Sequence, residues 1–303
     1  MITGTVFLAY QIYPLTQSQE KIHLVVHLNP NQDTITQKLK AEGLIRSITI
    51  YNLLINQLYQ SQTIQPAGYF IEKRANIFEV MNILYNHPSE KWIVIAPGLR
   101  KEQIAERFAN KFNWGREEVE GFLANSQEGY LFPDTYLINL DATGKEAAKK
   151  LTDNFNEKVK TGVYPQALKK NIRLETVVKI ASLIQRESGT SEDKKLISGI
   201  IWNRLNIDMA LQIDATIQYS MGSSASWWPQ VKGEDLKIDS PYNTYLIVGL
   251  PPTPIASPSL ESLEAAVEPQ ETSCLFYLHD KYMKIHCSQT YEEHLENIRR
   301  FLN

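Results

Sequence analysis

The residue with the clearest catalytic chemistry in this sequence is Glu187. It lies three, four and seven residues after Ile184, Leu183 and Ile180, on the apolar face of a predicted helix that ends at Gly189. A carboxyl group that emerges where an apolar face stops is partly desolvated, and desolvation raises its pKa. Such an acid keeps its proton near neutral pH and can act as a general acid. The alternative is an ordinary helix-terminal glutamate that lies in solvent or is paired with Arg186.

Four segments around Glu187 in the sequence are rich in polar and aromatic side chains. One precedes it, Glu128–Tyr136, and three follow it, Leu211–Tyr219, Tyr242–Tyr245 and Gly249–Ile255. A packed core does not need this density of hydroxyl, amide and carboxyl groups, whereas a binding cleft does. The candidate binding residues in these segments are therefore Glu128, Gln212, Asp214, Tyr219, Tyr242, Asn243, Thr244 and Tyr245.

These segments, together with Arg186–Ser188, resemble the MltG (YceG-like) family of endolytic murein transglycosylases. Arg186–Ser188 also resembles the catalytic Glu-Ser of other lytic transglycosylases, which adds Ser188 to the candidate binding residues. The blocks occur in the family's order, and the similarity extends from about residue 22 to the C-terminus. The chain departs from the family at Thr253, where the family usually has Gly. This departure concerns a local turn.

The resemblance implies a mechanism with one carboxylic acid, whereas ordinary glycosidases use two. Glu187 would protonate the bridging oxygen of the MurNAc-β-1,4-GlcNAc bond, and its carboxylate would then take the proton of the MurNAc C6 hydroxyl. That hydroxyl attacks C1 and leaves a 1,6-anhydroMurNAc end without consuming water. The implied enzyme is a lyase that cuts nascent peptidoglycan strands, limits their elongation and so serves cell wall biogenesis and organization. Its implied partners are the glycan strands and cell-wall synthases.

The residues themselves leave simpler roles open. Asp214 is as well placed to cap a helix as to bind a sugar. Glu128 can bind a sugar, brace Glu187 or belong to a structural turn. A non-catalytic peptidoglycan-binding scaffold is the alternative function. His286 and His294 have no second ligand at metal spacing, so we predict no metal, and no lysine context indicates a pyridoxal phosphate cofactor.

Length and composition predict a globular chain of one large or two modest domains. Its 303 residues are 43% hydrophobic and 21% charged, and the net charge of -3 gives no reason to expect nucleic acid. The predicted fold class is α+β. A strand, two helices and a strand resemble a LysM module over residues 20–90. LysM domains bind N-acetylglucosamine polymers, so this module is predicted either to hold glycan or to act as a scaffold that only positions the active site. Residues 91–303 are the predicted catalytic domain, which mixes helices and strands and ends in a hairpin.

Residues 1–19 are interpreted as an N-terminal arm or the remainder of a membrane anchor. The apolar part of residues 1–15 is far shorter than the ~20 residues that span a bilayer, and no basic region precedes it. Members of the family usually carry one N-terminal transmembrane helix. The resemblance therefore implies a single-pass protein of the inner membrane with its catalytic domain in the periplasm.

The two cysteines of the chain lie in the predicted C-terminal hairpin. If its turn is His279–Tyr282, Cys274 and Cys287 lie opposite each other on neighbouring strands. A location outside the cytoplasm permits a disulfide, although antiparallel spacing strains a bridge between directly opposed residues. The sequence leaves open whether the two are bonded.

Overall fold

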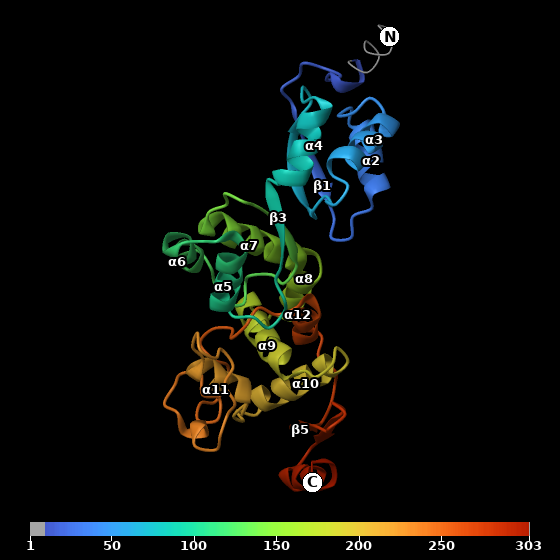
Figure 1. The fold of residues 1–303 in the computed structure, drawn as a ribbon. Helices are drawn as coiled ribbons and strands as arrows, with labels where there is room; N and C mark the ends of the chain where they lie inside the picture. Colours follow the sequence, from blue (N-terminus) through green and yellow to red (C-terminus); the bar gives the residue numbers. More distant parts are fainter. Residues whose placement is uncertain (1–9, 303) are drawn as a thin grey trace. The chain divides into compact units, whose positions relative to one another are not determined.

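The computed structural model describes residues 10–302, which form two compact units (Figure 1). Unit 1 comprises the chain up to Val94 together with Thr135–Ala142. Unit 2 comprises Ile95–Asp134 and the chain from Thr143 onward. The chain therefore leaves unit 1, returns to it for one strand and leaves it again.

From residue 21 onward, unit 1 is an antiparallel sheet with three helices. The strands occur in the order β1-β2-β3-β4. Their bounds are β1 Lys21–Val26, β2 Ala67–Glu72, β3 Glu90–Val94 and β4 Thr135–Asn139. The helices are α2 Gln32–Ala41, α3 Ile48–Leu58 and α4 Ile77–Asn86. Leu24, Leu39, Tyr69 and Leu84 are almost fully buried in its core.

Local signals begin the helices of unit 1. The Ser47 side chain accepts the N–H of Ile50 and caps α3. Asn76 and Glu79 form a capping box at the start of α4, in which each side chain accepts a hydrogen bond from the other residue's N–H. These caps satisfy backbone donors that the first turn of a helix leaves free.

Unit 2 is mostly helical. Its helices are α5 Lys101–Phe112, α6 Arg116–Ala124, α7 Gly144–Thr161, α8 Val163–Lys169, α9 Leu174–Glu187, α10 Asp193–Asn206, α11 Asp214–Met221, the 3-10 helix η1 Asp235–Lys237, α12 Leu260–Val267 and α13 Tyr291–Phe301. Two strands, β5 Phe276–His279 and β6 Ile285–Ser288, form an antiparallel hairpin just before α13. The predicted α+β class with a C-terminal hairpin is confirmed.

Helix α9 lies at the centre of unit 2, against α10 and α12 (Figure 1). Val177, Val178, Ile180, Leu183 and Ile184 have no exposed surface. Their three and four residue spacing places them around one side of the helix, as the sequence predicts. The packing of α9 therefore fixes the position of the residue at its C-terminal end.

The predicted domain boundary at residue 91 falls inside β3, and the LysM-like character of residues 20–90 stays a prediction. Of the predicted arm or anchor, residues 1–19, the first nine residues lie outside the described part of the chain. Within residues 10–302, no helix combines the length and apolar character needed to cross a membrane.

The C-terminal hairpin has a different register from the predicted one. The turn is longer than His279–Tyr282, because His279 pairs with Ile285 and the carboxylate of Asp280 accepts the N–H groups of Tyr282 and Lys284. The predicted direct opposition of the two cysteines is therefore wrong.

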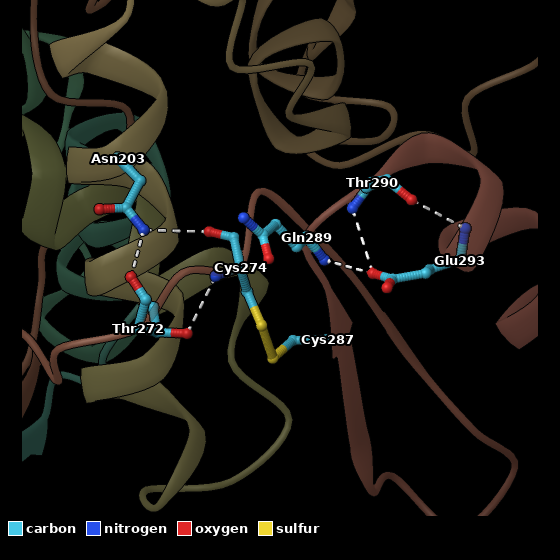
Figure 2. The surroundings of a disulfide bond; sticks show 7 residues. All are labelled: Asn203, Thr272, Cys274, Cys287, Gln289, Thr290 and Glu293. Carbon is cyan, nitrogen blue, oxygen red and sulfur yellow. Dashed lines mark hydrogen bonds between the residues drawn. A yellow bond between two sulfur atoms is a disulfide. The ribbon is translucent and has the colours of Figure 1, made fainter.

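Cys274 and Cys287 are nevertheless joined by a disulfide, with 5.8 Å between their Cα atoms (Figure 2). Cys274 lies two residues before β5, and Cys287 lies opposite Tyr277 within the hairpin. Figure 2 also shows the Asn203 amide of α10, which donates to the carbonyls of Thr272 and Cys274 at 2.8 and 3.1 Å. The bonded cysteines therefore link the hairpin to the segment that runs along α10.

Candidate active site

Glu187 is the last residue of α9 and lines a cavity of about 280 Å³, here called the α9 cavity. Ser188 leaves the helical conformation, with φ -72° and ψ 128°, and its N–H donates to the carbonyl of Ile184 at 2.9 Å. Glu187 thus stands where helix periodicity predicts it, at the point where the buried face of α9 ends. The predicted binding residue Ser188 forms the C-cap.

Side chains from separate parts of unit 2 meet at the α9 cavity. Its lining residues besides Glu187 are Arg204, Leu211, Gln212, Asp214, Tyr245, Phe276, Tyr277, Tyr291 and His294. They come from α10, the start of α11 with its preceding segment, the loop around Tyr245, the hairpin and α13. The structure therefore brings three predicted binding residues, Gln212, Asp214 and Tyr245, to the same cavity as Glu187.

Glu187 accepts a hydrogen bond from the phenol of Tyr277, with 2.7 Å between Oη and Oε2. Burial raises the pKa of Glu187, and the negative charge of Asp214 acts in the same direction. The Tyr277 hydroxyl, His279 and the N–H of Ala215 favour the charged form and oppose this rise. Burial dominates, so Glu187 keeps its proton to a higher pH than a glutamate in solvent.

Asp214 is the first residue of α11, and its Oδ1 accepts a hydrogen bond of 2.6 Å from the phenol of Tyr245. The N-cap of α11 is Ile213, without a side-chain cap bond, so the capping role considered for Asp214 is wrong. Burial, followed by the hydrogen bond to Asp214, raises the pKa of Tyr245. The phenol therefore remains a donor, and the carboxylate of Asp214 faces the cavity with one oxygen already bound.

The segment before α11 is hydrogen-bonded to the loop around Thr244, which follows α11 in the chain. Gln212 has a left-handed backbone with φ 52°, and its N–H donates to the carbonyl of Thr244 at 2.9 Å. The Thr244 hydroxyl accepts the N–H of Ile213 at 3.0 Å. The buried amide of Asn243 donates to two carbonyls of the preceding loop. Asn243 and Thr244 thus shape the backbone that presents Gln212 and Tyr245, and they do not line the cavity.

Arg204 of α10 connects its own helix to two other segments that border the α9 cavity. Its Nε donates to the carbonyl of Leu275 at 2.6 Å, and its Nη1 donates to the carbonyls of Ala210 and Leu211 at 3.2 and 2.6 Å. Its guanidinium carbon lies 5.1 Å from the ring centre of Phe276. One side chain of α10 therefore fixes both the segment before α11 and the entry to β5.

The sequence matches the YceG-like family over residues 24–300. The chain belongs to the YceG-like family. Two relatives named endolytic murein transglycosylase are 34% identical over 180 residues in Streptococcus pneumoniae strain D39 and 35% identical over 178 residues in Bacillus subtilis strain 168. Each match covers 58% of this chain but only 32% and 48% of those relatives, so the chain spans less than half of their length.

A solved structure of the family has the same fold. The crystal structure of a yceG-like protein from Listeria monocytogenes matches with a TM-score of 0.60 and 23% sequence identity. The match covers 92% of this chain and 99% of that protein. The arrangement of helices and antiparallel strands described above is therefore the fold of a YceG-like protein.

The other predicted site residues of this family member belong to a second polar cluster. Glu128 is 5% exposed, and its carboxylate accepts the N–H groups of Lys101 and Gly129 at 3.3 Å. The Tyr219 hydroxyl reaches the same carboxylate at 3.5 Å. Glu128 thus binds the first turn of α5 and contacts the middle of α11.

Burial raises the pKa of Glu128 to about 7. The Arg100 guanidinium lies 4.0 Å from the ring centre of Tyr219, which lies 4.8 Å from that of Tyr242. The Tyr242 hydroxyl forms a 2.8 Å hydrogen bond with Thr253, the residue that stands where the family usually has Gly. Glu128, Tyr219 and Tyr242 therefore form one cluster, and none of them lines the α9 cavity.

Sequence reasoning did not single out Phe276, Tyr277 or Tyr291 as cavity residues. The available signal was the aromatic pair Phe276 and Tyr277, which follows Leu275 in a predicted strand. That signal is incomplete, because only the hairpin register and the contacts with α10 decide which ring points at Glu187.

The histidines near the C-terminus have partners other than a metal. His286 shares a 3.0 Å hydrogen bond with Asp280 and stacks on Phe301 at 3.6 Å between ring centres. His294 stacks on Phe276 at 5.5 Å. Among the side chains of residues 10–302, no three His, Cys, Asp or Glu groups gather closely enough to hold a metal ion.

Proposed function

We propose that this chain is an endolytic lytic transglycosylase of murein, with Glu187 as its single acid and base. The observation that carries the proposal is the carboxyl of Glu187, whose pKa is raised by burial and which opens onto the polar α9 cavity. The names of the two relatives support the choice of murein as substrate. The chain spans only part of those relatives, so the activity requires a direct test.

In the proposed reaction, protonated Glu187 donates its proton to the oxygen of the MurNAc-β-1,4-GlcNAc bond as that bond breaks. The resulting carboxylate then accepts the proton of the MurNAc C6 hydroxyl, whose oxygen attacks C1. The glycan is cut into a GlcNAc end and a 1,6-anhydroMurNAc end, and water is not consumed. A raised pKa supports this dual role, because general acid–base catalysis is most effective when the pKa lies near the operating pH.

The groups around Glu187 suit a sugar with developing positive charge. Asp214 carries a negative charge on the same cavity, and a fixed charge of this sign stabilises positive charge at C1 in the transition state. Gln212 presents an exposed amide that can bind hydroxyl or N-acetyl groups. These two residues are the proposed substrate contacts on this cavity, and Tyr245 holds the carboxylate of Asp214.

The test is product analysis on purified murein glycan with the Glu187→Gln variant. The substitution keeps the size of the side chain and removes its acid, so release of anhydromuropeptides should fall at least a hundredfold. Glu264→Gln, an exposed change on α12, is the matched control and should retain the wild-type yield. Undiminished product from Glu187→Gln, measured by mass spectrometry, would contradict the role of Glu187.

The alternative, a peptidoglycan-binding scaffold, predicts a different result in the same digest. The wild-type chain would then bind murein without releasing anhydromuropeptides at any pH. The same experiment therefore decides between an enzyme and a scaffold.

The proposed location is the outer side of the inner membrane, where nascent strands and cell-wall synthases are found. The Cys274–Cys287 bond supports a location outside the cytoplasm, because disulfides persist in oxidising compartments. Protease treatment of spheroplasts should degrade the protein while cytoplasmic markers survive. Survival of the intact protein would contradict this location.

A further inference from the structure

The side chain of Tyr277 is hydrogen-bonded to the carboxyl of Glu187. The phenol donates to Oε2 at 2.7 Å, from a residue that lies 90 positions later in the sequence. Burial, followed by the neighbouring charge of Glu187, raises the pKa of Tyr277 well above its ordinary value. The hydroxyl therefore keeps its proton throughout the neutral range and always has a hydrogen to donate.

The backbone around Tyr277 is fixed from two sides. Within the hairpin, Tyr277 of β5 pairs with Cys287 of β6. Cys287 is in turn disulfide-bonded to Cys274, which lies two residues before β5. The carbonyl of Cys274 accepts from Asn203 of α10, as Figure 2 shows, and the next carbonyl, of Leu275, accepts from Arg204. The phenol is therefore presented by a strand that is cross-linked to β6 and hydrogen-bonded to α10.

The other polar groups near Glu187 come from every element that surrounds it. They are Arg186 of α9, Arg204 of α10, Asp214 and the Ala215 N–H of α11, Tyr245 of the following loop, His279 of β5, and Tyr291 and His294 of α13. Of these, Asp214 raises the pKa of Glu187, whereas His279 and the Ala215 N–H lower it. Tyr277 differs from them in that its side chain is hydrogen-bonded directly to the carboxyl group.

We propose that Tyr277 is a positioning residue for Glu187, which orients the carboxyl toward the scissile bond and stabilises its charged form after proton transfer. This inference rests on the proposed function. In the first half of the reaction the phenol holds Oε2 and so fixes the orientation of the carboxyl while it donates its proton to the glycosidic oxygen. In the second half the same hydrogen bond holds the carboxylate while it receives the C6 proton.

The effect on pH dependence has a definite sign. A donor to the carboxylate favours the charged form and lowers the pKa, so removing the donor raises the pKa of Glu187 further. Activity requires the protonated acid and is lost as the pH rises through this pKa. Loss of the Tyr277 hydroxyl should therefore move the alkaline limb of kcat to higher pH, by about one pH unit for a hydrogen bond to a charged group.

The experiment compares Tyr277→Phe with the wild-type chain on soluble murein glycan across the pH range. The variant keeps the ring that packs in the hairpin and lacks only the hydroxyl. We expect kcat at neutral pH to fall about tenfold, KM to change little, and the alkaline limb to move upward. Tyr282→Phe removes a phenol hydroxyl from the turn of the same hairpin, where the side chain is 79% exposed, and should behave as wild type.

The outcomes separate the two proposals. If the wild-type chain yields no anhydromuropeptides, the proposed function fails, whatever the variant does. If the wild-type chain is active and Tyr277→Phe has the same kcat and pH profile, the positioning role is overturned. A lower kcat with an unmoved alkaline limb also overturns it, because a purely structural effect of the substitution reduces activity without changing the pKa of Glu187.

Discussion

Glu187 and Glu128 are two acids of unit 2 whose pKa is raised by burial, yet their surroundings give them different chemistry. Glu187 opens onto a cavity and accepts a hydrogen bond from a side chain that arrives from the hairpin. Glu128 is enclosed and accepts two backbone N–H groups. A raised pKa alone therefore does not single out a candidate catalytic acid, and access to a cavity distinguishes Glu187 from Glu128.

We predict that Glu128 makes the free energy of unfolding fall as the pH rises from about 4.5 to about 7. The unfolded chain releases this proton near the ordinary pKa of 4.5, whereas the folded unit retains it to about 7. Between these values the folded state binds more protons, so stability decreases with increasing pH, by about 3 kcal/mol in total. Glu128→Gln should remove this decrease, as measured by urea unfolding at a series of pH values.

Glu264→Gln is the control for this measurement, because the side chain is exposed on α12. Its dependence of stability on pH should run parallel to that of the wild-type chain. Parallel curves for Glu128→Gln as well would show that Glu128 is not protonated in the folded unit at neutral pH.

For single residues, the sequence predicts those positions that follow from the local periodicity of a helix. Glu187 follows Ile180 and Ile184 along one helical face, so its position at the end of a buried stripe can be read from spacing alone. Tyr277 could not be found in that way, because its contact with Glu187 spans 90 residues and depends on how the hairpin is docked. Asn243 shows the converse, since an amide that suits a sugar is in fact buried and bonded within its own loop.

The hairpin supplies Phe276 and Tyr277 to the α9 cavity. Its strands are only four residues long, and isolated two-stranded hairpins are marginally stable in water. The disulfide and the hydrogen bonds from Asn203 and Arg204 supply the missing restraint. Its existence could be predicted from the sequence, but its register could not, because a five-residue turn with Met283 at φ 63° replaces the shorter predicted one.

We predict that replacing both cysteines, Cys274→Ser with Cys287→Ser, destabilises unit 2 by about 3 kcal/mol, the loop-closure value for a bridge of this length. The sequence separation of the bridge is 13 residues. The hairpin should then hold Tyr277 less firmly, so the rate of anhydromuropeptide release should fall as well. Urea unfolding and product analysis of the double variant measure the two effects.

The wild-type chain treated with reductant is the matched comparison for the double serine variant. Both should show the same loss of stability and rate, since both lack the same covalent link. Thiol titration of the untreated folded protein should find no free thiol. Two free thiols in that sample, or an unchanged rate in the double variant, would contradict the role assigned to the bridge.

At the scale of the whole molecule, the chain divides into units with separate hydrophobic cores. Tyr69 and Leu84 belong to the core of unit 1, while Leu183 and Ile184 belong to the core of unit 2. Length predicts one large or two modest domains, but it does not predict that β4 returns to unit 1 from within the later part of the chain. Such a return is not visible in local patterns, because strand pairing between distant segments leaves no periodic signal.

Separate cores predict two unfolding transitions, which substitutions in each core should assign. Leu84→Ala and Leu183→Ala each remove a fully buried side chain, and each should lower the stability of its own unit by about 3 kcal/mol. Leu84→Ala should shift only one transition in calorimetry and leave anhydromuropeptide release intact, because the α9 cavity lies wholly in unit 2.

Leu183→Ala should shift the other transition, which reductant should also lower, because the disulfide lies in the same unit. It should reduce product release too, since Leu183 packs in the helix that ends at Glu187. A single transition that moves equally with both substitutions would show that the two units unfold as one. In that case a destabilising substitution in either core would also destabilise the helix that ends at Glu187, and activity would depend on the stability of the whole chain.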